Sequence, residues 1–196
     1  MKTMKMKKWA TLGVALLFGT AVFAGNYEID TKASHVGWHG KKVTGEHNGA
    51  IEVKDGSLAV VDGKIKGGTI SIDMQSITNE DITNEEYNQK LVGHLKSDDF
   101  FGVETYPTAS LVLTDVKMSG TNYTFTGDLT IKGITKAITF EGTSEGGNDG
   151  LTVAGKMTID RSDYNVKYGS SSFFDNLGDK MIHDDFTLTY KIVAKK

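Results

Sequence analysis

The feature that most constrains this chain is a two-residue alternation of apolar and polar side chains, repeated in segment after segment. It is clearest over residues 123–131, where one side carries large apolar side chains: Tyr123, Phe125, Leu129 and Ile131. Similar alternation covers residues 43–54, 65–77, 108–116, 151–159 and 186–192. Successive side chains of a strand point to opposite faces, so each segment predicts a strand with one apolar face. The pattern predicts about eight or nine such strands.

The short connections between these segments favour antiparallel pairing. Asp62-Gly63 is a strong hairpin signal, and other turns fall at residues 54–56, 119–122 and 132–135. An open sheet of so many amphipathic strands would leave a wide apolar face in water. The sheet must therefore close on itself or fold into two packed layers. A barrel of about eight strands has room inside for side chains or for one small ligand.

Three inward positions of these strands carry glycine instead of a large side chain: Gly49, Gly127 and Gly155. Two interpretations stay open. The glycines leave space for a ligand, or they let the strands bend, as glycine often does in barrel strands.

One segment, Thr83–Pro107, departs from the strand pattern and predicts a helical insertion near residues 83–101. Thr83 and Glu86 match a T-x-x-E capping box, which satisfies free backbone N–H groups where a helix begins. Apolar side chains then recur on one helical face, at Tyr87, Leu91 and Leu95. The sequence predicts that the helix begins at this box.

Two adjacent phenylalanines follow the predicted helix. Ser97 is expected to cap a second short turn, with two aspartates near its N-terminal end. Phe100 and Phe101 come next with no polar residue between them. Both cannot lie in water without cost, so at least one is expected to insert into the β-structure.

The first 24 residues predict a secretory signal peptide. Four lysines precede an apolar run over residues 9–23, and small or compact residues come before an expected cleavage after Ala24. Residues 25–196 then form one domain, without a further transmembrane segment. Because the chain has no cysteine, an exported form suits a bacterial periplasm, where it needs no disulfides.

Charge argues against nucleic acid as a partner. Removal of the four leader lysines changes the formal net charge from −3 to −7, and no basic run remains. An acidic chain of this kind is poorly suited to a phosphate backbone.

The sequence predicts neither catalysis nor metal binding, and no cofactor is implied. It contains no G-x-S-x-G elbow, phosphate loop or H-E-x-x-H motif. The histidines lack a spacing that converges on a metal, and the paired aspartates resemble helix-start and turn residues. Arg161 is the one arginine of the chain. It could clamp a phosphate or carboxylate, but pairing with Asp163 or Asp184 is the favoured interpretation.

Several motifs, in order along the chain, resemble the YceI-like family of lipocalin-like, polyisoprenoid-binding bacterial proteins. The longest is L-x-x-H-L-x-S-x-D-F-F-x-V-E-x-Y-P over residues 91–107, followed by G-D-L-T-I-K-G-I-T-K over residues 127–136. I-D-R-x-x-Y-x-V and D-x-F-x-L follow at residues 159–166 and 184–188, with weaker matches near residues 33–47. The resemblance implies an all-β fold: an extended antiparallel β-barrel of about eight strands with one helical insertion. It also implies a long apolar tunnel, periplasmic or secreted location and frequent homodimers.

The candidate site follows from the apolar pattern together with this resemblance. Twelve residues are expected to line the tunnel: Trp38, Phe100, Phe101, Leu111, Leu113, Phe125, Leu129, Ile131, Phe140, Phe173, Phe174 and Phe186. Two more are candidate polar contacts for a lipid head group: His94 and Arg161. Periodicity alone cannot say whether the apolar residues enclose a ligand or only each other.

Three functions remain from the sequence. The first is a periplasmic binding or carrier protein for an isoprenoid, a quinone or a fatty-acyl compound, which needs no catalytic residue. The second is an enzyme or redox accessory acting on an isoprenoid quinone, with His94, Asp99 or Arg161 near the mouth of the barrel. The third is an interaction module whose barrel is filled by its own side chains.

Overall fold

The computed structural model describes residues 24–147 and 149–196. The predicted leader lies outside the described residues, apart from Ala24, with which the first strand begins. Within these ranges the strands are β1 (Ala24–Ile29), β2 (His35–Lys42), β3 (Gly45–Val61), β4 (Lys64–Asp73), β5 (Thr108–Ser119), β6 (Asn122–Ile131), β7 (Ile134–Gly147), β8 (Gly150–Asp160) and β9 (Ile182–Lys195). The helix α1 spans Glu85–Lys96, and short 3₁₀ turns cover Met74–Ser76, Arg161–Tyr164 and Gly178–Lys180.

The strands form a closed antiparallel barrel. Each strand from β4 to β9 pairs with its neighbour in sequence, β9 pairs with β2, β2 with β3, and β3 with β4. The 17-residue strand β3 is long enough to hold two partners on one edge: β2 along Gly45–Ile51 and β1 along Ser57–Val61. β1 and β2 therefore share one of eight positions around the barrel. The predicted barrel fold is confirmed.

Register shifts interrupt several of the strand pairings. They occur in β2 between Gly40 and Lys42, in β3 near Val53 and Ala59, and in β5 after Leu113. An extra residue in one strand of an antiparallel pair increases its local twist and bend. These bulges help a sheet of long strands to curve into a closed barrel.

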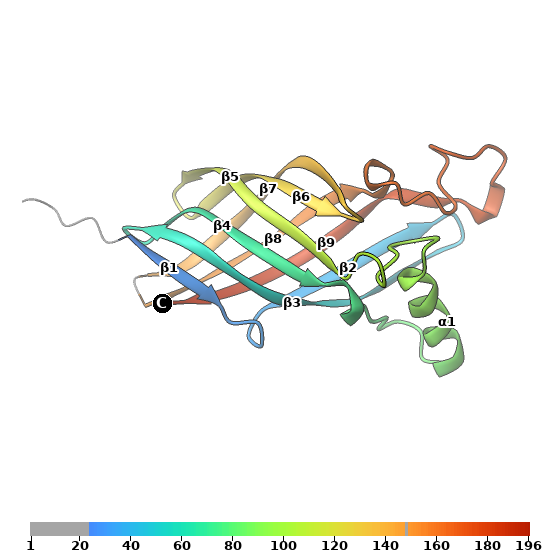
Figure 1. Ribbon diagram of the computed structural model, residues 1–196, viewed down its shortest axis with the longest axis horizontal. Helices are drawn as coiled ribbons and strands as arrows, with labels where there is room; N and C mark the ends of the chain where they lie inside the picture. Colours follow the sequence, from blue (N-terminus) through green and yellow to red (C-terminus); the bar gives the residue numbers. More distant parts are fainter. Residues whose placement is uncertain (1–23, 148) are drawn as a thin grey trace, which may run out of the picture.

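The two ends of the barrel differ. At one end, two-residue turns join β3 to β4 and β5 to β6. Asp62 and Gly63 both adopt positive φ, 51° and 72°, as the predicted hairpin requires. The other end, called the mouth end here, carries the long connections: residues 74–107 with α1, and residues 161–181 between β8 and β9. Figure 1 shows α1 and the segment before β9 at this end, opposite the C-terminus.

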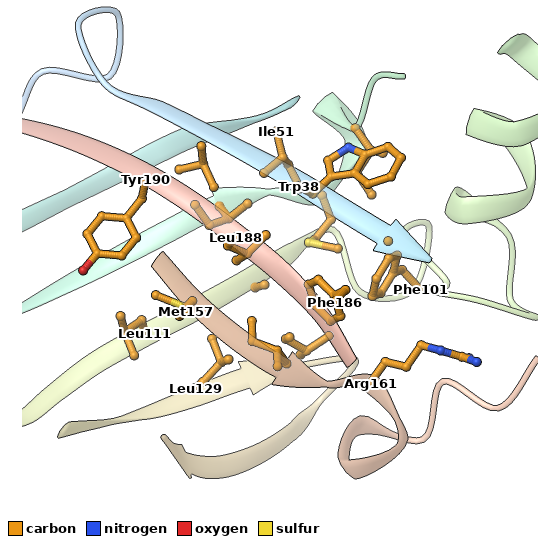
Figure 2. Close-up of a pocket in the computed structure, with 18 of the residues that line it drawn as sticks. Trp38, Ile51, Phe101, Leu111, Leu129, Met157, Arg161, Phe186, Leu188 and Tyr190 are labelled. Atoms are coloured by element: carbon orange, nitrogen blue, oxygen red, sulfur yellow. The ribbon is translucent and has the colours of Figure 1, made fainter. Parts of the chain in front are cut away.

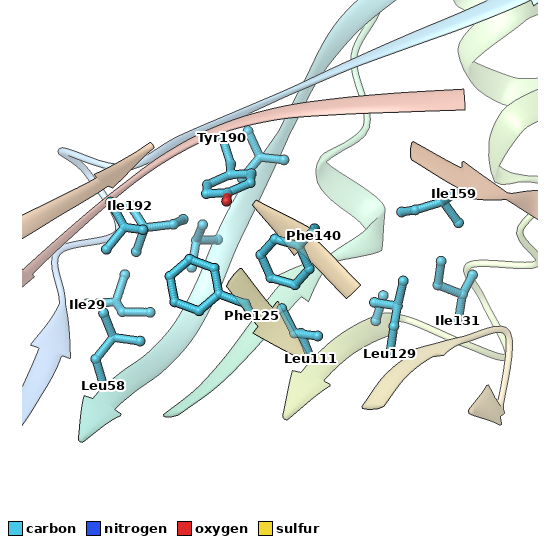
Figure 3. Close-up of a cluster of buried hydrophobic side chains, with 14 of the residues drawn as sticks. Ile29, Leu58, Leu111, Phe125, Leu129, Ile131, Phe140, Ile159, Tyr190 and Ile192 are labelled. Carbon is cyan, nitrogen blue, oxygen red and sulfur yellow. The ribbon is translucent and has the colours of Figure 1, made fainter. Parts of the chain in front are cut away.

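Buried side chains fill the barrel away from the mouth end. Tyr123, Phe125, Phe140 and Tyr190 follow one another as a chain of ring contacts, with centroids 5.4, 5.3 and 5.8 Å apart. Figure 3 shows Phe125, Phe140 and Tyr190 of this chain beside Ile192 and Leu58. Further buried residues pack toward the far end: Tyr27, Val60, Leu151 and Ala194. This end of the barrel is a packed core.

The helix forms where the sequence predicts it, with a different cap. Asn84, not Thr83, is the N-cap, and its side-chain oxygen accepts a hydrogen bond from the Tyr87 N–H at 3.1 Å. The predicted capping box is therefore wrong by one residue. Ser97 ends α1, with its N–H and hydroxyl both donating to the His94 carbonyl. The expected short turn does follow, since the Ser97 carbonyl accepts the Phe100 N–H at 3.0 Å, but the Ser97 side chain bonds back to α1 and does not cap it. Tyr87 is 62% exposed, whereas Leu95 is buried.

Candidate functional site

An apolar cavity of about 380 Å³ lies inside the barrel, between the packed far end and the mouth end. Pockets of a few hundred Å³ with mostly apolar walls are typical of small-molecule sites. Five of the residues that line it are exposed to solvent: Lys41, Lys42, Glu46, Tyr168 and His183. All five lie near connections at the mouth end, so the cavity opens there.

Ten of the twelve predicted lining residues face this cavity: Trp38, Phe100, Phe101, Leu111, Leu113, Phe125, Leu129, Ile131, Phe140 and Phe186. The structure brings them together from β2, β5, β6, β7, β9 and the segment after α1. Whether they touch a ligand stays a prediction.

Phe173 and Phe174 were expected in the tunnel, and this placement is wrong. They are 41% and 50% exposed and do not line the cavity. Both lie in the connection between β8 and β9, outside the barrel wall. No strand alternation holds them, so nothing in the sequence pattern directs their side chains inward.

The sequence reasoning missed other members of the wall: Ile51, Ile70, Ile72, Leu91, Met157, Leu188 and Tyr190. The signal was present, because six of these seven belong to the alternating strand segments. Alternation marks the inward face of each strand, but it does not say which part of that face meets empty space.

Strand β9 shows where the cavity begins and ends. Its inward residues Phe186 and Leu188 are only partly buried, whereas the next inward residues, Tyr190 and Ile192, are buried. Figure 2 shows Tyr190 at one end of the site and Arg161 at the other, with Leu188 and Phe186 between them. An inward apolar side chain inside a closed barrel stays accessible only if it borders a cavity.

Tyr190 forms the floor. Its hydroxyl donates a hydrogen bond to the Glu141 carbonyl at 2.9 Å, and burial raises the pKa of the phenol to about 12. A Cβ at Gly142 would lie 2.5 Å from the phenol oxygen, and one at Gly155 would also collide with it. Gly155 thus makes room for Tyr190.

Neither of the other two inward glycines leaves ligand space. A Cβ at Gly127 would lie 2.6 Å from the Val112 carbonyl oxygen, and one at Gly49 would collide with the Thr78 backbone. Both positions need glycine because another backbone segment passes close by.

The segment before and after α1 forms one wall of the mouth. Phe100 is buried at 7% exposure, which confirms that at least one of the two adjacent phenylalanines inserts into the β-structure. The Phe101 ring meets Phe186 edge to face at 6.3 Å. Lys132, in the turn between β6 and β7, donates to the carbonyls of Asp98 and Phe100 at 2.9 and 2.7 Å and holds this segment in place.

A polar network attaches the start of this segment to β3. The Asp81 carboxylate accepts the Asn48 N–H, the Asn79 amide and the His47 ring nitrogen at 2.6–2.8 Å. Burial alone would raise the pKa of Asp81, but these hydrogen bonds outweigh it and lower the pKa below its ordinary value. The Trp38 indole N–H also donates to the Thr78 carbonyl at 2.9 Å.

His94 lies on the cavity wall near its opening. Its ring is partly buried and packs edge to face against Tyr168 and Phe100, with centroids 4.4 and 5.7 Å away. Within the described residues, no hydrogen bond or ion pair reaches its ring nitrogens. The imidazole can therefore bond to a polar group inside the cavity mouth.

Arg161 also lines the cavity, but most of its donors are already bonded to the protein. Only 2% of the residue is exposed, and its guanidinium donates to four carbonyls: Val166, Tyr168, Ile182 and His183. The terminal Nη2 also lies 3.2 Å from Asp184 Oδ1 as an ion pair, although that oxygen accepts no hydrogen bond within the described residues. Burial lowers the pKa of the guanidinium, and the carboxylates of Asp184 and Asp160 oppose that shift. The structure thus favours the pairing with Asp184 over a head-group contact.

Two further observations concern the described ranges only. No three acidic or histidine side chains among residues 24–147 and 149–196 converge to hold a metal ion. In the same ranges, no helix combines the length and apolar character needed to cross a membrane.

The fold and site together define a closed antiparallel barrel with an apolar cavity open at one end. Residues 27–194 match the model of the YceI-like domain, so the chain belongs to that family. A UPF0312 protein of Photorhabdus laumondii is 28% identical over 200 residues, with 95% of each chain covered.

Solved structures share the architecture. BcnA of Burkholderia cenocepacia superposes with a TM-score of 0.64 at 26% identity, covering 85% of this chain and 99% of BcnA. A polyisoprenoid-binding domain from Saccharophagus degradans, implicated in plant cell wall breakdown, gives a TM-score of 0.61 at 15% identity. That match covers 86% of this chain and 97% of the domain, and at such identity it shows the fold alone.

Proposed function

We propose that this chain is a periplasmic binding or carrier protein for an amphiphilic lipid: a polyisoprenoid, an isoprenoid quinone or a fatty-acyl compound. The observation that carries the proposal is the uncovered apolar wall inside the barrel. Phe186 and Leu188 point inward, yet they remain partly accessible beside an empty space of about 380 Å³. A lipid chain would cover this wall, and each methylene that it buries would contribute about 0.8 kcal/mol.

The polar groups are distributed as an amphiphile requires. From Leu188 to the Tyr190 floor the wall is apolar, and the Tyr190 hydroxyl is occupied by Glu141. Near the opening, His94 keeps its ring nitrogens available, and Lys41 and Lys42 follow at the rim. We place the head group beside His94 and the chain along β9. Arg161 helps to shape this site without contacting the ligand.

Two features support binding, as opposed to chemistry or protein interaction alone. The barrel is not filled by its own side chains, which disfavours a ligand-free module. Three histidines line the site, and within the described residues only the His47 ring has a carboxylate partner, Asp81, which fastens the segment before α1 to β3. The polyisoprenoid-binding domain of Saccharophagus degradans supports a prenyl chain as one ligand class to test first.

Filling the cavity should abolish lipid uptake. In Leu188→Trp the larger side chain would occupy the space between Phe186 and Tyr190. Thr189→Trp is the matched control, because Thr189 is the next residue of β9 and is exposed. We expect the control to take up prenyl or acyl lipids from detergent solution and Leu188→Trp to lose at least about tenfold in affinity. If the original protein binds neither lipid class, the proposed function is wrong.

The periplasmic location of the protein can be tested separately from lipid binding. We infer export from the four lysines and the apolar run before residue 24. Fractionation of a Gram-negative host should find the full chain in the periplasm and a form without residues 1–24 in the cytoplasm. Equal distribution of both forms would argue against a periplasmic carrier.

A further inference from the structure

We propose that an exposed apolar lip beside the cavity mouth docks the barrel onto an anionic lipid bilayer. The lip consists of Val43, Tyr168, Phe173 and Phe174. This inference rests on the proposed function, because a carrier of a water-insoluble chain must meet a membrane to load or unload it. The structure assigns this contact to one side of the mouth end.

The lip gathers most of the large apolar side chains that the fold leaves in water. Seven such side chains are exposed in the described residues, and four of them form the lip, with exposures of 50%, 48%, 41% and 50% in chain order. They come from two connections that lie together, since the Val43 N–H donates to the Met181 carbonyl at 3.1 Å. Large apolar side chains left exposed on neighbouring connections are the kind of surface that marks a site of interaction.

The lip is held outward by a buried framework. Arg161 bonds to the carbonyls of Val166 and Tyr168 on one side of the segment and to Ile182 and His183 on the other. Between them, the Phe173 and Phe174 N–H groups both donate to the Ser170 carbonyl, and Ser170 is fully buried. The aromatic side chains are thus displayed from a braced loop, which lowers the entropy lost on docking.

Charge favours a bilayer with anionic lipids as the occupant. Residues 41–43, at the end of β2, and residues 165–181 together carry four lysines and two aspartates, in a chain that is otherwise acidic. Lys41 also pairs with Glu46 at 3.7 Å, so Lys42, Lys167 and Lys180 are the lysines most available to a bilayer.

The Lys167 ammonium lies 5.1 Å from the centre of the Phe173 ring. Lysines beside tyrosine and phenylalanine suit the head-group region, where rings enter the interface and ammonium groups meet phosphates. The acidic first turn of α1, Glu85 and Glu86, lies on the other side of this end (Figure 1).

The lip is continuous with the cavity. Tyr168 is 48% exposed and also lines the cavity, and its ring contacts His94 at 4.4 Å. Lys41 and Lys42, which precede Val43 of the lip, likewise line the cavity. A lipid leaving a bilayer beneath the lip would pass Tyr168 and reach the apolar wall without crossing bulk water.

Vesicle flotation tests the proposal directly. The full domain, residues 25–196, would be mixed with vesicles of phosphatidylcholine alone or with one third phosphatidylglycerol. We expect flotation with the anionic vesicles, weakened by salt, and a loss of at least about tenfold in Phe173→Ser/Phe174→Ser. Val112→Ser/Met118→Ser is the matched control, because these two residues are also exposed and apolar but lie on β5. The control should float like the original protein.

Other outcomes overturn the proposal. Absence of flotation, or equal flotation of both double variants, excludes the lip as the docking surface. A dimer that Phe173→Ser/Phe174→Ser converts to monomers would assign the lip to a second copy of the chain.

If that variant does not fold, Lys42→Glu/Lys167→Glu replaces it, and unchanged flotation then counts against the proposal. Normal lipid uptake from detergent without flotation refutes the lip alone, whereas failed uptake refutes the proposed function.

Discussion

At the residue scale, Arg161 shows how a side chain that resembles a ligand contact can serve the fold. Its guanidinium is buried, four of its N–H groups donate to backbone carbonyls, and the Asp184 carboxylate forms an ion pair with it at 3.2 Å. A ligand phosphate would have to break one of these hydrogen bonds or displace the Asp184 carboxylate. Its function is to hold residues 166–184 against the end of β8, and through Tyr168 to shape the cavity mouth.

Removing this side chain should destabilise the protein strongly. Arg161→Met leaves Asp184 without its charge partner and four carbonyls without donors, so we expect a loss of about 3–5 kcal/mol in the free energy of unfolding. Lys136→Met is the control, because Lys136 is exposed and forms only a 4.0 Å ion pair with Asp163. We expect Lys136→Met to lower the free energy of unfolding by less than about 1 kcal/mol. Urea unfolding that gives similar losses for both would contradict the structural role.

The buried hydroxyl of Tyr190 is the basis of a second prediction at the residue scale. Tyr190→Phe removes one hydrogen bond to Glu141, so the free energy of unfolding should fall by about 1 kcal/mol. Because burial raises the pKa of Tyr190 to about 12, this phenol stays neutral where ordinary tyrosines ionise. Its contribution to stability is present below about pH 10 and is lost as pH rises toward its own pKa.

The near-ultraviolet absorbance of tyrosinate measures whether the Tyr190 phenol stays neutral at high pH. At about pH 11 the folded original protein and Tyr190→Phe should show the same increase, because Tyr190 contributes little there. A clearly larger increase in the original protein would show that the Tyr190 hydroxyl ionises normally and is not buried at the cavity floor.

At the element scale, the segment with α1 is attached to the barrel by a few polar contacts. Asp81 joins His47, Asn48 and Asn79 on one side, and Lys132 holds the Asp98 and Phe100 carbonyls on the other. The position of Phe101 at the cavity wall depends on both attachments. Lowering the pH should weaken the first attachment, because it depends on the Asp81 carboxylate.

The sign of this effect follows from Asp81. Its pKa in the folded protein lies below the ordinary value of 3.8, so its contribution to stability is present above about that pH and is lost as pH falls through the folded pKa. Asp81→Asn should be less stable than the original protein at neutral pH, and the difference should shrink below about pH 4. Thermal melts of both proteins across this range measure it. A difference that stays constant with pH would exclude ionised Asp81 as the fastening group.

The same segment shows the reach of sequence reasoning. The helix and the insertion of at least one of the two adjacent phenylalanines were predictable, because capping residues, helical periodicity and adjacent aromatics are local signals. The exact cap was not, since Thr83 and Asn84 both suit an N-cap and only the fold selects between them. Tyr87 shares the spacing of Leu95 yet is exposed, because α1 packs only its later turns against the barrel.

At the scale of the whole molecule, the residue pattern predicted amphipathic strands but left a closed barrel and two packed layers as alternatives. The barrel and its apolar tunnel were expected only from the family resemblance. Alternation gave the strands, and the Asp62-Gly63 turn fixed one hairpin. The empty space depends on which inward side chains meet across the barrel. In the sequence, Gly155 was compatible with ligand space or with strand bending, and in the structure it admits the Tyr190 hydroxyl. Leu188 looks like ordinary core in the sequence but borders the cavity.

The central claim is that this cavity holds a lipid chain. Native mass spectrometry of the protein, purified from the periplasm of its own host without detergent, tests it most directly. The account predicts a bound species with the mass of a prenyl or acyl lipid, and its loss in Leu188→Trp but not in Thr189→Trp. A protein that is always empty, or a bound mass that persists in Leu188→Trp, would contradict the account.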